Sequence, residues 1–524
     1  MYEDAQVVWF KRDLRVTDHA PLVSAAQRGP VLPLFIVEPN ILTAPDFDTL
    51  HYEFIRQALV ELRENLHVLG QPLIVRTGPV VNVLADLHRL VRFDTIWSHE
   101  ETGNHLTYQR DLAVKQWAEI HRVRWNELPQ NGVVRRLKSR NGWAKHWEDR
   151  IMGTPPLAKP DRLQNGPHVE IGQIPTAEEL RLRSAAPRLQ HKIQPGGEAE
   201  AQRHLLSFLA GRGKDYRRGM SSPTSGETAC SRISPYLAWG CLSIRQAAHA
   251  AYAEIQRPGH QIPKNEIQSF TGRLHWHCHF IQKLESEPEI EFRCFNHACE
   301  SLRAEPPPDH ERRLDAWITG HTGYPFLDAC MRSLRATGWL NFRMRAMLVS
   351  FAAYNLWLDW RVFNAPLACH FLDYEPGIHF SQIQMQSGTT GISALRIYNP
   401  IKQGLDHDPE GHFIRQWVPE IAGIPTPLIH TPWKSRANNP CAYPDPIVDH
   451  LGTARMAKTN FSALRKSATH KEEAKRVFAE HGSRKHRNPA SEAAHRNGGN
   501  HLPLRSRRKQ NGAPTQFQIE IQFE

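Results

Sequence analysis

Residues 7–18 read VVWFKRDLRVTD and decide the fold of the first quarter of the chain. Four apolar residues that fit a buried strand are followed at once by a charged turn, the usual place for ligand contacts in an open α/β sheet. Outward from this stretch, short apolar runs alternate with segments of helical spacing, which predicts a parallel sheet covered by helices on both faces. The expected strands are 7–10, 31–37, 72–75, 94–98 and 122–125, and the expected helices are 20–28, 50–69, 80–91 and 106–120.

The rest of the chain changes character twice. Pro, Gly, Arg and Gln with weak periodicity predict a surface connector, and the helical patterns that follow it predict an all-α domain. The last segment is polar and basic, so we expect a disordered tail, with an arm that attracts nucleic acid as the alternative. The expected divisions are an α/β domain (1–130), a connector (131–199), an all-α domain (200–430) and the tail (431–524).

Composition indicates which kind of partner the protein binds and in which cellular compartment it works. A net charge of +11 and a pI near 9.3 favour polyanionic partners. Residues 431–524 carry 17 Lys and Arg against 8 Asp and Glu, so nucleic-acid binding by the remaining body needs a local basic patch. Eight Cys without a C-x-x-C pair predict reduced thiols in a cytoplasmic protein. The sequence has no apolar leader and no run of 18 apolar residues, so we expect no membrane span.

A second motif opens the helical part, where residues 231–243 read SRISPYLAWGCLS. Hydroxyl side chains and backbone N–H groups beside a Pro-initiated helix can hold a diphosphate, although S-x-x-S-P alone would be only a helix cap. In the next motif, Asp328 and Arg332 stand at i and i+4 on a helix, which favours a structural pair. The further motifs are GHTGYPFLDACMR at 320–332, TGW at 337–339, RIYNP at 396–400 and DPEGHFIRQWVPE at 408–420.

Taken in order over residues 1–430, these motifs resemble those of the DNA photolyase and cryptochrome family. The resemblance implies a Rossmann-like α/β domain with a parallel sheet, followed by an all-α C-terminal domain that binds FAD. It also implies that Asp373 pairs with Arg345 beside the flavin, where a guanidinium stabilises reduced flavin; a salt bridge without a redox role is the alternative. The expected cofactor-binding residues are Tyr216, Cys230, Ser231, Arg232, Ile233, Ser234, Arg273, His277, Arg343, Arg345, Asp373, Tyr374 and Glu375.

The expected substrate pocket departs from the family pattern E-L-x-W-R-E-F, because residues 273–280 read RLHWHCHF. Trp276 keeps the aromatic platform on which a flipped base stacks. Arg273 replaces the Glu that bonds a pyrimidine dimer in relatives, so Glu266 is the candidate substitute acceptor. A protonated His pair would instead suit a different lesion. His275 and His279 lie at metal-ligand spacing, but no second ligand pair is near in sequence, and we expect no metal.

The expected electron-transfer route is also altered. The family commonly photoreduces its FAD through three Trp residues, and Trp360 matches the middle one. No Trp lies between residues 361 and 416, where the flavin-proximal one belongs. The candidate substitutes are Trp357, Trp339, Tyr374 and Tyr398, unless these are only core aromatics.

The function expected from this sequence is that of a photolyase. It would repair ultraviolet-induced pyrimidine lesions in DNA by blue-light electron transfer, as a monomer with damaged DNA as partner. A cryptochrome-like photoreceptor is the alternative, and a folate or deazaflavin antenna in the first domain is left open. Trp276, Arg345, Asp373 and His379 are the expected catalytic residues, Trp276, Arg273 and Arg396 the expected DNA contacts, and Trp360, Trp357 and Trp339 the expected electron carriers.

Overall fold

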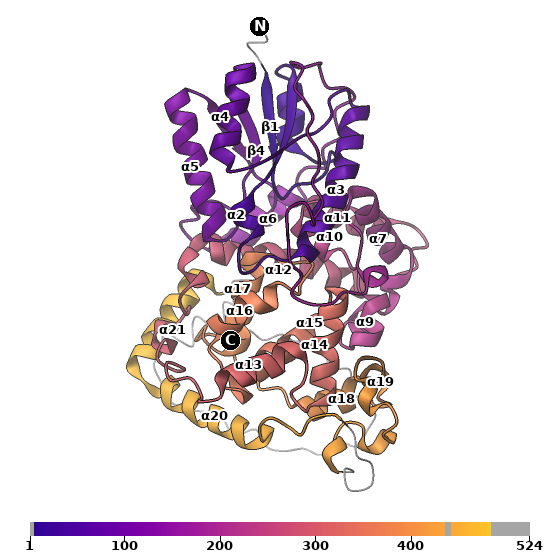
Figure 1. The fold of residues 1–524 in the computed structure, drawn as a ribbon, viewed down its shortest axis with the longest axis vertical. Coiled ribbons are helices and arrows are strands. Elements are labelled where there is room, and N and C mark those ends of the chain that lie inside the picture. The colour runs from indigo at the N-terminus through magenta and orange to yellow at the C-terminus, as the bar shows by residue number, and fades with distance from the viewer. Residues whose placement is uncertain (1–4, 435–441, 484–524) are drawn as a thin grey trace.

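The first part of the chain is a five-stranded parallel sheet with helices on both faces, seen at the top of Figure 1. The computed structural model describes residues 5–434 and 442–483. The strand order is β3-β2-β1-β4-β5, so the chain reverses direction across the sheet between β1 and β4, which places the ligand crevice at their carboxyl ends. The strands are β1 (Gln6–Phe10), β2 (Val31–Val37), β3 (Ile74–Thr77), β4 (Thr95–His99) and β5 (Arg124–Leu128).

Alternate side chains of β1 enter two different cores, as the pleat of a strand requires. Val7 and Trp9 belong to a buried cluster under α4 and α5. Val8 and Phe10 belong to a larger cluster that contains α1 and α3 residues and continues into the helical domain. The sheet and the helical domain are therefore joined by shared apolar packing. The covering helices are α1 (Ala20–Ala26), α2 (Pro39–Leu42), α3 (Thr49–Val68), α4 (Val80–Val91) and α5 (His105–His121).

The second domain is all-helical, as expected, and fills the lower part of Figure 1. The connector between the domains contains one helix, α6, and runs beside the sheet domain. A buried cluster that includes Trp317, Trp360 and Phe363 forms the centre of the helical domain. The helices are α6 (Trp143–Ile151), α7 (Glu198–Ala210), α8 (Tyr216–Gly219), α9 (Pro223–Ala229), α10 (Ser234–Ala238), α11 (Ile244–Gln256), α12 (Lys264–Ser286), α13 (His310–Thr319), α14 (Pro325–Thr337), α15 (Phe342–Ser350), α16 (Trp360–Ala368), α17 (Pro376–Ser387), α18 (Pro400–His407) and α19 (His412–Trp417).

The expectation of a disordered tail from residue 431 is wrong for residues 450–481, which form two helices along the edge of the domain (Figure 1). α20 (His450–Lys466) is capped by Asp449, and it packs the buried Phe461 against Tyr354. α21 (Ala468–His481) is capped by Ser467 and buries Val477 in the helical core. Few apolar residues are enough here because they line one face of each helix. The basic run 505–509 lies outside the described residues.

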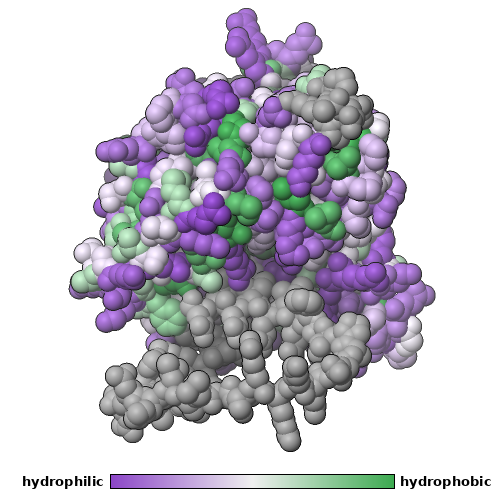
Figure 2. Space-filling view, turned by 90° about the horizontal axis from the view of Figure 1, so that it is seen from below, coloured by the Kyte–Doolittle hydropathy of each residue, from purple (hydrophilic) through white to green (hydrophobic). Residues whose placement is uncertain are grey.

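Within residues 5–434 and 442–483, no helix is both long and apolar enough to cross a bilayer. Figure 2 views the molecule from its helical end, where the visible hydrophobic residues form small groups between hydrophilic ones. Such scattered exposure is ordinary for a protein surface.

Candidate functional site

The centre of the candidate site is a bidentate ion pair between α15 and the loop before α17. Nη1 and Nη2 of Arg345 each donate to a carboxylate oxygen of Asp373 at 2.9 Å. Burial acts to raise the pKa of Asp373, but the Arg345 charge and hydrogen bonds from Arg345 and Ser234 hold it below its usual range. Asp373 is therefore ionised at neutral pH. The pairing that the resemblance implied is present, and Ser234 joins it.

The loop that ends at Ser234 is fixed from behind. The guanidinium of Arg212 donates to the main-chain oxygens of Cys230 and Ser231, and Gln194 bonds both the carbonyl and the side chain of Arg232. Arg232 has a φ of 61°, a left-handed conformation that is rare for a residue with a side chain. These hydrogen bonds stabilise the strained conformation of Arg232. The loop is thus held in one shape before any ligand binds.

Tyr216 and Arg273 lie close together, and both are near Cys230. Tyr216 is buried, and burial raises the pKa of its phenol although the hydrogen-bonded Arg273 opposes that rise. Burial likewise raises the pKa of Cys230 to about 11, against the positive charges of Arg232 and Arg345 and of two further Arg residues. The surroundings of Cys230 are therefore electropositive. A dinucleotide with a diphosphate carries the complementary charge.

His277 carries the clearest sign of a missing polar partner. Its Nδ1 is buried and has no hydrogen-bond partner among the described residues. The side chain lines a cavity together with Arg12 and Glu375. Burial, with the nearby Arg12 charge, lowers the pKa of His277 to about 4, so the ring is neutral. A neutral imidazole with an unused nitrogen fits a polar ligand edge in this space.

His379 lies beside the ion pair and is fixed as a hydrogen-bond acceptor. Its Nε2 lies 3.0 Å from the carbonyl oxygen of Asn364, so Nε2 donates and Nδ1 keeps its lone pair. Burial lowers the pKa of His379 to about 4. The ring of Tyr374 packs edge-on against it, with centroids 5.1 Å apart.

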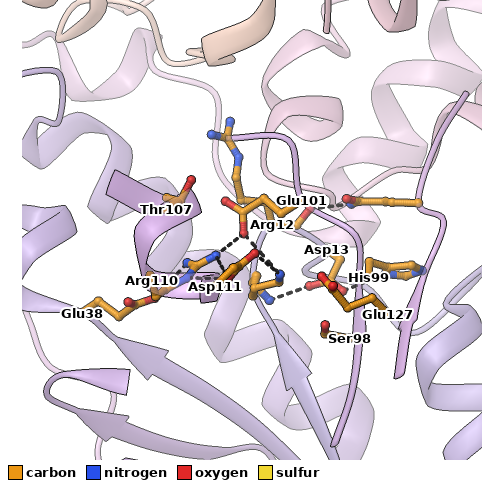
Figure 3. A network of polar contacts seen from close by, with 12 residues as sticks. Arg12, Asp13, Glu38, Ser98, His99, Glu101, Thr107, Arg110, Asp111 and Glu127 are labelled. Atoms are coloured by element: carbon orange, nitrogen blue, oxygen red, sulfur yellow. Dashed lines mark hydrogen bonds and ion pairs between the residues drawn. The ribbon is translucent and has the colours of Figure 1, made fainter. Parts of the chain in front are cut away.

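A second pocket, here called the sheet-edge pocket, opens at the carboxyl ends of β1 and β2. It contains about 850 Å³ of space not filled by atoms, open solvent included, and its mostly apolar wall includes Phe35 and Trp239. A buried charge network closes one side: Arg110 contacts Glu38, Glu101 and Asp111 at 3.0, 2.6 and 2.9 Å (Figure 3). The sequence predicted ligand contacts at the turn after β1, but not this pocket.

Comparison with known proteins agrees with this geometry. Residues 6–142 match the family model described as DNA photolyase, and residues 270–463 match the FAD binding domain of DNA photolyase. A deoxyribodipyrimidine photo-lyase from Halobacterium salinarum is 30% identical over 499 residues, which cover 88% of this chain and 99% of that protein. The chain belongs to the DNA photolyase and cryptochrome family. The fold class expected from the sequence is confirmed.

Both branches of the photolyase and cryptochrome family are among the relatives. A cryptochrome DASH from Gloeobacter violaceus is 28% identical, with 87% of this chain and 95% of that protein covered. A class III photolyase structure from Agrobacterium tumefaciens has a TM-score of 0.76 at 25% identity, with 89% and 99% of the two chains covered. The helical domain is thus a photolyase FAD-binding domain. The electropositive loop around Ser231, the unused Nδ1 of His277 and the Arg345–Asp373 pair fit that cofactor.

The photolyase substrate platform expected at Trp276 is partly exposed on α12, where its ring stacks with Phe280 at 5.7 Å and meets His279 edge-on at 4.8 Å. Glu266, the candidate substitute acceptor, is engaged within the protein. Its Oε2 accepts the backbone N–H of Arg217 at 2.6 Å. A role for Glu266 toward a substrate stays a prediction.

The three Trp expected to carry electrons have separate surroundings. Trp360 is fully buried, Trp357 packs beside Phe461, and Trp339 lies under the guanidinium of Arg232. No ring contact joins any two of them within residues 5–434 and 442–483. Their role as electron carriers stays a prediction.

Arg343 was expected to contact the cofactor, and Arg396 to contact DNA. Arg343 is two residues from Arg345 on α15, so the two side chains leave different faces. Its charge acts on His407 of α18, whose pKa is lowered first by burial and then by this guanidinium. Arg396 is partly exposed, and its carbonyl accepts the hydroxyl of Ser350. Both expected roles stay predictions.

A buried cluster of one carboxylate and two His side chains lies just past the carboxyl end of β1, and the sequence did not indicate it. Oδ2 of Asp13 lies 3.0 Å from His19 Nε2 and 2.7 Å from His99 Nδ1 (Figure 3 labels Asp13 and His99). His19 Nδ1 accepts the N–H of Leu22, so its Nε2 carries the proton. These bonds anchor the turn that holds Lys11 and Arg12 at the sheet edge.

Proposed function

We propose that this protein is a DNA photolyase, which repairs ultraviolet-induced pyrimidine lesions under blue light with FAD held by the helical domain. The Arg345–Asp373 pair next to Ser234 is the observation that carries this proposal. Reduced FAD supplies an electron to the lesion when excited by light, and all other tasks fall to the chain.

In this proposal the chain's own residues bind the FAD, orient it and tune how easily it is reduced. The loop 230–234 and Tyr216 hold the nucleotide end, supported by the hydrogen bonds of Arg212 and Gln194. Arg345 presents a guanidinium whose position is fixed by Asp373, and a fixed positive charge favours an electron-rich flavin. His379 offers a neutral acceptor at Nδ1, while His277 offers a second neutral ring from α12.

The lesion is expected at Trp276, because a partly exposed indole on α12 stands on the same helix as Arg273 and His277. A flipped base stacks on such a ring. Arg273 is engaged with Tyr216. Lesion recognition by this chain therefore rests on stacking more than on a carboxylate.

The test is direct repair. Protein with reduced FAD is mixed with oligonucleotides that carry either cyclobutane or (6-4) lesions, and lesion loss is measured by chromatography in blue light and in darkness. Light-dependent loss of one lesion, reduced in Trp276→Ala, supports the proposal. No light-dependent loss of either lesion would overturn it.

A second candidate is a blue-light photoreceptor without repair activity. The observation that favours it is the pocket itself: Arg273 stands where dimer-repairing relatives place Glu, and Glu266 is bound to the backbone of Arg217. If this alternative holds, the holoprotein would undergo flavin photochemistry yet leave both lesions intact.

The sheet-edge pocket is proposed as the place for a second, light-harvesting chromophore. Its apolar wall suits a flat aromatic ring system, and the Arg110 network offers polar groups at one side. Extraction of the purified protein and identification of any second pigment by mass spectrometry tests this assignment.

A further inference from the structure

Two of the tryptophans that could pass an electron to the flavin face a cation. The guanidinium of Arg232 lies 4.0 Å from the ring centre of Trp339, and that of Arg303 lies 4.9 Å from Trp357. A cation over an indole face is favourable while the ring is neutral. It becomes a like-charge contact once the ring loses an electron, so these two positions disfavour an indole radical cation. Trp360 lies 5.0 Å from Arg361, whose charge is balanced by Asp359 and Glu300.

Tyr374 has the opposite environment. Its phenol donates a hydrogen bond of 2.6 Å to Oδ2 of Asp46, from the loop after α2. The same oxygen accepts the side-chain amide of Asn104 at 3.0 Å, so the carboxylate is oriented toward the phenol. A phenol that loses an electron becomes strongly acidic, and Asp46 is in place to take its proton. By contrast, no carboxylate accepts the phenol of Tyr398 among the described residues.

Tyr374 also connects the Arg345–Asp373 pair with the sheet-edge pocket. It follows Asp373 directly in the chain, and its ring packs on His379. Its carbonyl accepts Nη2 of Arg12 at 2.6 Å, which fixes the backbone at this point. On the other side, Tyr374 and Asp46 both line the sheet-edge pocket, which opens to solvent. When no second chromophore occupies that pocket, a small reductant can approach Tyr374 through it.

We propose that Tyr374, with Asp46 as its proton acceptor, is the residue that donates electrons for photoreduction of the bound flavin. This inference rests on FAD binding as proposed above. In each round, Tyr374 would give one electron to the bound flavin under blue light, and its phenolic proton would move to Asp46. An added thiol that enters the sheet-edge pocket would then return one electron to the phenoxyl radical and lose its own proton to water, while Asp46 returns the phenolic proton. Two rounds would deliver two electrons to the flavin and leave two thiyl radicals, which pair as one disulfide.

The experiment measures photoreduction in the holoprotein. Oxidised, FAD-loaded protein is illuminated with blue light in the presence of dithiothreitol, and loss of the flavin absorbance is followed per bound FAD. Tyr374→Phe is expected to slow the rate about tenfold or more, which corresponds to about 1.4 kcal/mol in the barrier. Asp46→Asn keeps a polar partner but cannot take the proton, so it is expected to slow the rate as well.

The matched control is Tyr443→Phe. Tyr443 is another buried tyrosine that bonds a carboxylate, and its partner is Asp328 on α14. The control is expected to photoreduce at the wild-type rate. If Tyr374→Phe and Asp46→Asn both match that rate, the inference is overturned.

A second readout identifies the radical without reference to repair. Frozen, illuminated holoprotein is examined by electron paramagnetic resonance, with ring-deuterated tyrosine incorporated. A tyrosyl signal that narrows on deuteration and is lost in Tyr374→Phe supports the inference. A tryptophanyl signal that persists in Tyr374→Phe contradicts it while leaving FAD binding intact. A protein that takes up no FAD would overturn the proposed function and this inference together.

Discussion

Replacing Asp373 by Asn tests the ion pair at the centre of the site. The substitution keeps the shape of the side chain but removes the charge that faces Arg345 at 2.9 Å. The Asp373 side chain is only 5% exposed, whereas Arg345 keeps 24%. Breaking a buried pair costs about 3–5 kcal/mol, and partial hydration of Arg345 reduces this to about 2–3 kcal/mol. We expect that loss in the free energy of unfolding, together with weaker FAD retention.

The assay is urea unfolding of the holoprotein, with FAD release followed in parallel by fluorescence. Glu420→Gln is the matched control, because it removes an ion pair to Arg332 whose partners are 16% and 25% exposed. A pair of that kind contributes about 1 kcal/mol or less to the free energy of unfolding. Its removal should leave FAD retention unchanged. If Asp373→Asn loses no more than Glu420→Gln in both measurements, the role assigned to the pair is refuted.

Three further predictions concern pH, packing and DNA. Burial lowers the pKa of His51 to about 4 in the folded protein, against a pKa near 6.5 in the unfolded chain. The free energy of unfolding therefore falls as the pH drops below about 6.5. His51→Gln should reduce that fall by about 2 kcal/mol between about pH 7 and pH 5, measured by urea unfolding. Phe461→Ala should cost about 3–5 kcal/mol, while the exposed Met456→Ala should change little; equal unfolding curves would contradict the packing of α20. Trp276→Ala should weaken binding of lesion-bearing oligonucleotides about tenfold or more without affecting undamaged DNA; an unchanged dissociation constant would exclude stacking on this ring.

The sheet domain could be predicted from the sequence because its signals are local. The helix expected at 50–69 is α3 (Thr49–Val68), and the strand expected at 31–37 is β2 (Val31–Val37). Both are specified by apolar periodicity over consecutive residues. By contrast, α20 and α21 were missed because the basic composition of residues 431–524 as a whole masked the sparse apolar stripe within 450–481.

The site was predictable only where motifs are contiguous. The Arg345–Asp373 pair joins residues 28 positions apart, and the sequence suggested it through the family resemblance, not through spacing. The sheet-edge pocket was not found, because its walls come from several segments distant in sequence. The engagement of Glu266 with the backbone of Arg217 was also invisible, since no pattern reports which donor a carboxylate meets.

The measurement that tests the account most directly is the flavin content of the purified protein. Wild-type protein should carry FAD, or take it up when it is supplied, in proportion to the chain, with FAD released on denaturation and identified by chromatography. Asp373→Asn should hold it less tightly. A wild-type protein that stays colourless and binds no added FAD would contradict the assignment of Tyr216, Ser234 and Arg345 as its cage.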